Sequence, residues 1–285
     1  MSPLEDKYIN PLTDFGFKRL FGTELNKELL IDFLNQILPD KKIKELTYSS
    51  GEKQGLTELD RKAIFDLYCI GENGERFIVE MQKAKQNYFK DRSVFYASFP
   101  IQEQAKMNKW DYKLAPVYSI GILDFIFDDH KEEEELLHIV ELKDQNCEVF
   151  YDKLKFVYIE LPKFKKEEKD LVTQYDKWLY VFTHLSELQN RPQKLQDRIF
   201  AKLFESAEIA KFSKKERAAY EDSLKYYRDI KNVVDTSKEE GKEEGREEGR
   251  EERNLEIAIE LKKNNVSTEI IMKSTGLSKE EIEKL

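Results

Sequence analysis

Residues 65–82 read FDLYCIGENGERFIVEMQ, and their pattern predicts the central elements of the fold. Two runs rich in β-branched and aromatic residues, 62–70 and 76–83, lie on either side of the turn sequence Glu72-Asn73-Gly74-Glu75. Such runs are typical of β-strands, and Asn-Gly between them is a strong hairpin signal. The stretch therefore predicts two antiparallel strands joined by a tight turn.

The register of this hairpin decides which side chains share a face. A two-residue turn would place Asp66 and Glu80 on opposite faces of the sheet. One apolar set on each strand argues against that register because its members all have odd numbers: Phe65, Leu67 and Cys69 on the first strand, and Phe77, Val79 and Met81 on the second. Placing both apolar sets on one core face requires a three-residue loop or a β-bulge, and Asp66, Glu80 and Gln82 then share the other face.

Asp66 and Glu80 are candidate metal ligands. Two carboxylates that converge beside a polar third residue, here Gln82, suit Mg²⁺, which binds one or two carboxylates together with substrate phosphate oxygens. Such an ion can polarise a phosphoryl group and help form the attacking hydroxide. The alternative is a pair of ordinary carboxylates on a solvated strand face. Apolar neighbours indicate a half-buried face, on which a metal offsets the cost of unpaired carboxylates: Ile64, Tyr68, Ile70 and Ile78.

The elements around the hairpin predict a mixed α/β architecture. Thr13 or Asp14 can cap a short helix that ends at Gly22, and residues 26–38 form a second amphipathic helix before Pro39. Further elements are expected, in chain order, as a strand at 43–49, a helix at 88–109, strands at 117–127, 136–142 and 155–161, and three helical stretches over 167–234. This order indicates an α/β core with a helical annex.

The C-terminal part combines charge with a glycine repeat. Gly241, Gly245 and Gly249 recur every four residues, so they would form a stripe along a charged helix at 236–254. The stripe permits close helix–helix contact and hence a homo-oligomer. The alternative is a solvated linker, because each glycine costs a helix about 1 kcal/mol. Short helices are expected beyond it, without a basic face for reading DNA, at 255–263, 268–273 and 275–282.

Composition narrows the class of protein. Charged residues make up 37% of the 285 residues, and the aromatic content of 12% argues against a disordered chain. Two cysteines imply no disulfide framework, and the sequence has neither a signal-peptide pattern nor a membrane-length apolar run, so we expect a cytoplasmic protein without membrane contact. Glycine-rich phosphate loops and nucleophile motifs are absent from the sequence. His130, His138 and His184 show no metal-ligand spacing and are expected as surface or core residues.

The net charge of −9 discourages a nucleic-acid partner at first sight. Residues 1–110, however, contain 17 basic and 17 acidic residues, so the excess negative charge lies in residues 111–285. The part with Asp66 and Glu80 is therefore neutral, and the net charge does not exclude DNA. It predicts weak non-specific DNA affinity that falls with salt.

Asp66, followed fourteen residues later by Glu80-x-Gln82, resembles the Asp…(Glu/Asp)-x-Lys signature of the PD-(D/E)XK nucleases, with glutamine where lysine is more usual. Together with DFGFKRLFG at 14–22, the two strand motifs resemble the Rpn family of recombination-promoting nucleases, also described as transposases, in which Glu-x-Gln is the usual form. The Glu-Gly-rich C-terminal segment fits the same pattern. The resemblance covers most of residues 8–235.

This resemblance implies a restriction-endonuclease-like mixed sheet flanked by helices. It also implies a Mg²⁺-dependent DNA endonuclease, or one using another divalent cation, with a role in recombination, transposition or mobile-element defence. Asp66 and Glu80 would ligate the metal. Gln82 would stand in for the catalytic lysine, able to orient water but unable to supply charge.

Other residues would support the site. Lys18, Lys83 or Lys85 would supply the missing charge, and Lys18 is preferred because Lys83 is expected on the face opposite Gln82. Asp14 would be an additional ligand. Arg92 and Tyr96, four residues apart on one helical face, would contact phosphates or brace the site, unless they form an ordinary structural face.

We predict four segments: a nuclease-like core at 1–165, a helical annex at 166–235, a charged Gly-repeat helix or linker at 236–254 and a small helical unit at 255–285. Two alternative functions remain open. One is a catalytically weak DNA-binding module, which metal-independent DNA binding without cleavage would favour. The other is a protein-interaction module in which the nuclease-like core is vestigial.

Overall fold

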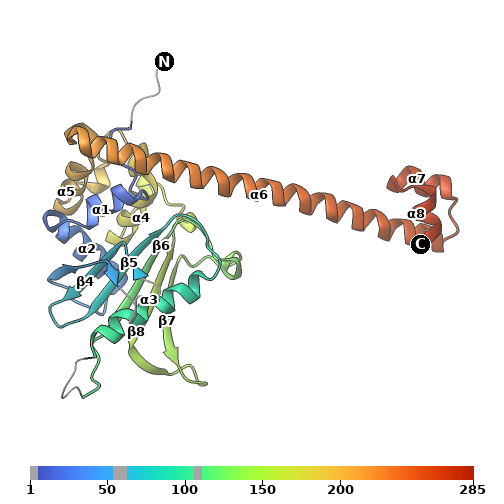
Figure 1. The fold of residues 1–285 in the computed structure, drawn as a ribbon. Helices are drawn as coiled ribbons and strands as arrows, with labels where there is room; N and C mark the ends of the chain where they lie inside the picture. Colours follow the sequence, from blue (N-terminus) through green and yellow to red (C-terminus); the bar gives the residue numbers. More distant parts are fainter. Residues whose placement is uncertain (1–5, 54–62, 106–110) are drawn as a thin grey trace. The chain divides into compact units, whose positions relative to one another are not determined.

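A six-stranded mixed sheet forms the centre of the fold (Figure 1). The computed structural model describes residues 6–53, 63–105 and 111–285. Strands β5, β6 and β8 run parallel, and antiparallel strands complete the sheet on both sides. The order across the sheet is β1 (Leu46–Ser49), β4 (Leu67–Gly71), β5 (Arg76–Gln82), β6 (Val117–Leu123), β8 (Val149–Glu160) and β7 (Leu137–Lys143). The predicted α/β class is confirmed.

The β4–β5 hairpin has the register that the apolar pattern predicted. Leu67 lies opposite Val79, and Cys69 lies opposite Phe77. Three residues, 72–74, form the loop, and Gly74 has a φ of +84°, a conformation that glycine adopts without strain. The odd-numbered side chains of both strands therefore face one core: Leu67, Cys69, Phe77, Val79 and Met81.

The predicted strand at 62–70 is interrupted, and residue 62 lies outside the described residues. Ala63–Ile64 forms β3, which pairs with β2 (Glu52–Lys53) in a separate two-stranded sheet. The chain bends at Asp66 before β4 begins. Because alternation does not continue through a bend, Phe65 packs with Tyr68 and Ile78 on the face opposite Leu67. The prediction that Phe65 shares the face of Leu67 is wrong for this reason.

Helices cover both faces of the sheet (Figure 1). The odd-numbered face packs against residues of α1 (Asp14–Phe21), α2 (Lys27–Ile37), α4 (Gln174–His184) and α5 (Arg198–Ala207). The other face packs against α3 (Phe89–Glu103), whose aromatic side chains contact β4, β5, β6 and β8. Side chains from the predicted core and the predicted annex thus share one hydrophobic core, exemplified by Phe21 and Trp178 with ring centroids 5.7 Å apart.

Several element boundaries differ from those predicted. Thr13 caps α1 as expected, accepting a hydrogen bond from the Gly16 N–H at 3.0 Å. Helix α3 ends at Glu103, short of the predicted 109, of which residues 106–109 lie outside the described part. Strand β8 begins at Val149, six residues earlier than expected, because it pairs with β7 over most of its length.

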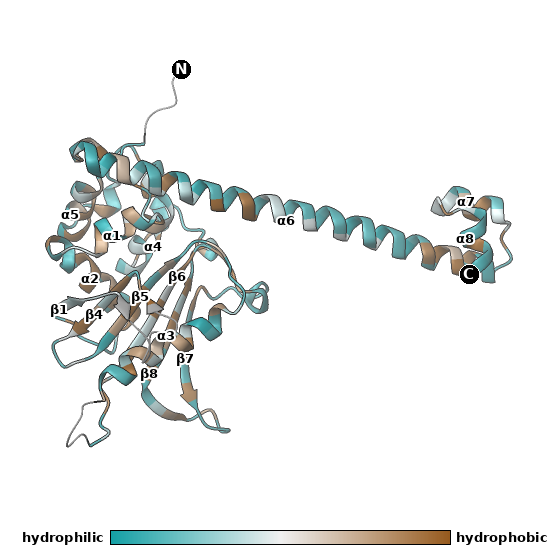
Figure 2. Cartoon of the chain, viewed as in Figure 1, coloured by the Kyte–Doolittle hydropathy of each residue, from teal (hydrophilic) through white to brown (hydrophobic). Residues whose placement is uncertain are grey.

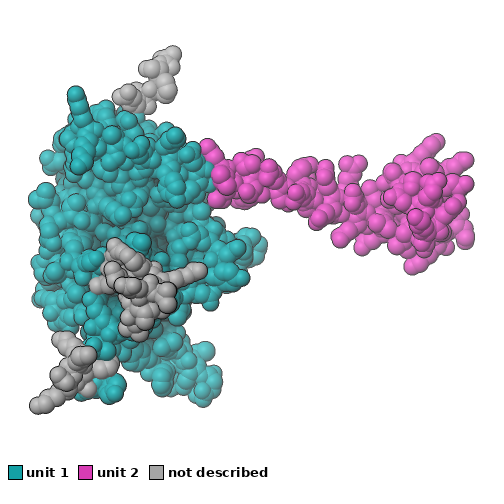
Figure 3. Space-filling model, viewed as in Figure 1, with its two compact units in different colours: residues 1–230 teal, residues 231–285 magenta. Residues whose placement is uncertain are grey.

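The chain divides into two compact units, residues 1–230 and 231–285 (Figure 3). Helix α6 (Lys214–Lys263) is continuous, so the Gly-repeat segment and the predicted short helix at 255–263 are parts of one element. Its charged segment is mostly hydrophilic (Figure 2). In the second unit, α7 (Thr268–Thr275) and α8 (Lys279–Lys284) pack on α6 around Ala258, Ile271 and Ile282. The four predicted segment boundaries stay a prediction.

Among the described residues, no helix is both long and apolar enough to span a membrane.

Candidate active site

Asp66 lies directly before β4, at the end of the sheet where β5 and β6 finish. Its Oδ2 accepts a hydrogen bond from the Met81 backbone N–H at 2.9 Å. Burial raises the pKa of this carboxyl, and the nearby Asp14 carboxylate adds to the increase. The Met81 N–H, Lys18 and Lys83 act in the opposite direction without cancelling it. Asp66 is thus a desolvated carboxyl that lacks full charge compensation.

Glu80 projects from the adjacent position on β5. Its side chain is only 13% exposed, and its neighbour across the parallel pair is Gly121 of β6. Burial raises the pKa of Glu80 to about 7, and repulsion from Asp66 adds to this shift, while Arg92 opposes it. The nearest Arg92 nitrogen lies 3.9 Å from Glu80 Oε2. The two largely buried carboxyls therefore repel each other when ionised, and the nearby positive charge does not compensate for this repulsion.

Gln82 is held in place by α3. Its Oε1 accepts a hydrogen bond from Arg92 Nη2 at 2.7 Å, and its Nε2 donates to the Ala84 carbonyl at 3.0 Å. The Arg92 guanidinium also lies over the rings of Phe89 and Tyr96, at 5.2 and 5.6 Å from their centroids. The structure thus brings Glu80, Gln82 and Arg92 together. The Tyr96 ring packs against the Arg92 guanidinium.

Asp14 and Lys18 approach Asp66 from α1. They form an ion pair of 2.9 Å in which both side chains are about half exposed. Lys83 also lies near this group, and its expected position on the face opposite Gln82 stays a prediction. Burial lowers the pKa of Lys83, against the attraction of Asp14 and Asp66.

Comparison with protein-family models shows which family the chain belongs to. The model of the PD-(D/E)XK nuclease family transposases matches residues 11–237, a span that includes every predicted site residue. The chain belongs to this family. No curated protein and no solved structure matches the chain significantly. The mixed sheet flanked by helices is consistent with the restriction-endonuclease-like fold that the family implies.

The structure adds residues that the sequence did not single out in this PD-(D/E)XK transposase. Gly121 lies between Glu80 and Tyr158 across three parallel strands, and a Cβ there would lie 3.1 Å from Tyr158 Cδ1. Asp124, directly after β6, donates its N–H to the Gln82 carbonyl at 2.9 Å and accepts from the Tyr227 hydroxyl at 2.7 Å. The sequence could have indicated Asp124, because it is an acidic residue directly after an apolar run that forms a buried parallel strand.

The histidines were expected as ordinary surface or core residues. His130 and His138 stack with ring centroids 4.0 Å apart, and both approach Glu160. His184 lies at the end of α4, stacked on Tyr180. Sequence spacing could not reveal the cluster because its members come from three separate elements.

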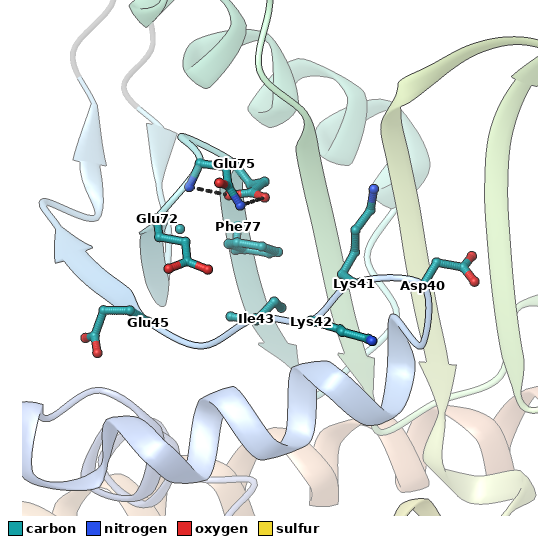
Figure 4. Close-up of a pocket in the computed structure, with 10 residues that line it drawn as sticks. Asp40, Lys41, Lys42, Ile43, Glu45, Glu72, Glu75 and Phe77 are labelled. Atoms are coloured by element: carbon teal, nitrogen blue, oxygen red, sulfur yellow. Dashed lines mark hydrogen bonds between the residues drawn. The ribbon is translucent and has the colours of Figure 1, made fainter.

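A surface pocket of about 330 Å³ lies at the other end of the β4–β5 hairpin. Figure 4 shows it between the chain after α2 and the hairpin loop, with Lys41 and Lys42 on one side and Glu72 and Glu75 on the other. It contains none of the predicted site residues. Its lining of opposite charges at the loop end gives no reason to associate it with phosphodiester chemistry.

Proposed function

We propose that this PD-(D/E)XK family transposase is a metal-dependent DNA endonuclease that hydrolyses phosphodiester bonds. The observation that carries the proposal is the pair of half-buried carboxyls, Asp66 and Glu80, whose pKa values are both raised. Active sites are places where burial and like charges shift pKa values in this way. Family membership supports a nuclease or transposase role.

The donor set fits a hard divalent cation. Asp66 and Glu80 offer carboxylate oxygens, the ligand type that Mg²⁺ prefers, at a point where negative charge is under-compensated. These two residues would hold the ion, with Asp14 as a further candidate ligand. When bound, Mg²⁺ would polarise the phosphoryl group of the substrate and make a bound water more acidic.

The remaining residues would bind and orient the DNA phosphate. Arg92 fixes the Gln82 amide through the 2.7 Å hydrogen bond, so the positive charge beside this position comes from α3 and not from the strand. Guanidinium groups are well suited to phosphate oxygens because they donate in a planar fork. Lys18 and Lys83 lie near the Asp66 side and add positive charge there. Tyr96 would brace Arg92 through the ring contact.

Plasmid cleavage tests the proposal directly. The full-length protein should nick or cut supercoiled DNA with Mg²⁺ and not with EDTA. Asp66→Asn and Glu80→Gln should each lower the rate by at least about 100-fold, since even residues that only orient metal ligands are worth 10–100-fold. Glu72→Gln, in the exposed hairpin loop, is the matched control and should cleave like the wild type.

The outcomes separate this function from its alternatives. Equal cleavage by the Asp66 and Glu80 variants would reject the assigned residues. Metal-independent DNA binding without cleavage would favour a DNA-binding module that keeps the nuclease fold. Absence of both cleavage and binding would favour a protein-interaction module.

We also propose that the Gly-repeat segment of α6 forms a homo-oligomer. A Cβ added at Gly241, Gly245 or Gly249 meets nothing within 4 Å in the single chain. Replacing all three with glutamine should therefore leave a monomer intact, but should dissociate an oligomer that uses close helix contact. Light scattering on the full-length chain measures the mass. A monomeric wild-type mass would reject the proposal.

A further inference from the structure

A cluster of two histidines and a glutamate lies where β8 ends. His130 closes the short helix Asp128–His130, His138 is on β7, and Glu160 is the last residue of β8. The side chain of Glu160 is fully buried, and those of His130 and His138 are 17% and 14% exposed. His130 Nδ1 lies 3.2 Å from Glu160 Oε1, and His138 Nε2 lies 3.2 Å from Glu160 Oε2. Three groups able to bind a metal thus converge in a sheltered position.

We propose that this cluster binds a zinc ion, independently of the nuclease function. The candidate ligand atoms all lie within 4.8 Å of one another. Zinc bonds of about 2.0–2.1 Å in a tetrahedron place neighbouring ligand atoms about 3.4 Å apart. Each histidine nitrogen lies 3.2 Å from one of the two Glu160 oxygens, so small side-chain rotations would bring all three groups to this spacing. Two imidazoles and a carboxylate form a known zinc donor set that leaves a fourth position for water.

The outward-facing ring nitrogens strengthen the assignment. His130 Nε2 lies 4.0 Å from Asp129 Oδ2, and His138 Nδ1 lies 4.0 Å from Glu133 Oε2. A metal-binding histidine commonly has a carboxylate behind its second nitrogen, which fixes the tautomer and strengthens the ligand. With zinc bound, each neutral imidazole would carry its proton on the outer nitrogen, facing one of these carboxylates.

Lys163 competes with the ion for the Glu160 carboxylate. Its Nζ lies 2.8 Å from Glu160 Oε2 and 2.9 Å from the Glu135 carbonyl. The Phe127 N–H donates to Glu160 Oε1 at 2.7 Å. Without metal, these donors and the two imidazoles satisfy the carboxylate. Removing the lysine charge should therefore tighten zinc binding, whereas a purely hydrogen-bonded cluster would gain no affinity for metal.

Zinc titration of the full-length protein tests the inference. The Asp66→Asn/Glu80→Gln double variant eliminates the acidic pair as a competing site, and calorimetry should still find one equivalent of zinc. Cobalt(II) in place of zinc should give the visible absorption bands of a low-symmetry tetrahedral site. Absence of a zinc equivalent and of these bands would overturn the proposal, whatever the outcome of the plasmid assay.

Substitutions in the same background locate the site. His138→Asn should lower zinc affinity at least tenfold, and His184→Asn, the matched control on α4, should leave it unchanged. Lys163→Met should raise zinc affinity at least tenfold. Circular dichroism before the titration confirms that each variant is folded. Unchanged affinity in both the His138 and Lys163 variants would place the zinc elsewhere and reject the cluster as its site.

Discussion

Replacing Glu80 with glutamine should stabilise the metal-free protein at alkaline pH. Glutamine keeps the shape of the side chain and removes its charge. The pKa of Glu80 is raised to about 7 in the folded state from an ordinary 4.5, chiefly by burial and then by Asp66. Between these two pH values the folded state holds a proton that the unfolded state has lost, so this group lowers stability as pH rises.

The size of the effect follows from the shift in pKa. Each unit corresponds to about 1.4 kcal/mol, so the penalty reaches about 3 kcal/mol above pH 7 and vanishes below about pH 4.5. The side chain of Glu80 is 13% exposed, so solvent screening reduces this figure little. Glu80→Gln should therefore add about 3 kcal/mol to the free energy of unfolding at pH 8 and almost none at pH 4.5.

Urea unfolding in EDTA, followed by tryptophan fluorescence, measures this difference because Trp178 is fully buried in the core. The experiment compares the wild type, Glu80→Gln and the exposed-loop control Glu72→Gln at pH values from 4.5 to 8. Only Glu80→Gln should show a gain that grows with pH. An equal gain at all pH values, or a loss at pH 8, would refute the electrostatic reasoning.

Three further predictions concern other residues of the two clusters. Asp66→Asn should lower the pKa of Glu80, because it removes the repulsion, and should abolish the stabilisation by Mg²⁺ that we expect thermal unfolding to detect in the wild type. Arg92→Gln should raise the pKa of Glu80, so the acidic limb of the cleavage rate should move to higher pH, whereas Arg92→Lys should move it less. Glu160→Gln should cost about 3 kcal/mol in urea unfolding, because it leaves the Lys163 ammonium buried without its carboxylate.

The register of the hairpin was predictable because it depends on a local property, the alternation of apolar side chains. The odd-numbered apolar side chains of both strands all face one core: Leu67, Cys69, Phe77, Val79 and Met81. This requires the register in which Leu67 lies opposite Val79, which a two-residue turn would not give. Asp66 lies directly before β4, and the hydrogen bond from the Met81 N–H on β5 brings its carboxyl near Glu80. Alternation failed outside the strands, at Phe65, where the chain bends.

The residues that sequence reasoning missed depend on contacts between distant elements. Asp124 joins the site region because β6 ends beside Gln82, and Tyr227 reaches it from α6. His130 and His138 meet because β7 pairs with β8 and returns His138 to the end where Glu160 lies. No spacing within one element encodes these contacts, so only the fold can reveal them.

Glutamine at position 82 moves the source of positive charge from the strand to a helix. Both ends of the Gln82 amide are occupied, by Arg92 and by the Ala84 carbonyl, so its orientation is fixed before any substrate binds. Arg92 lies 3.9 Å from Glu80 but does not return the pKa of that carboxyl to its ordinary value. Arg92 alone therefore leaves the acidic pair under-compensated, which favours recruitment of a divalent cation. The net charge of −9 is compatible with this arrangement because only the local deficit of positive charge determines whether a cation binds there.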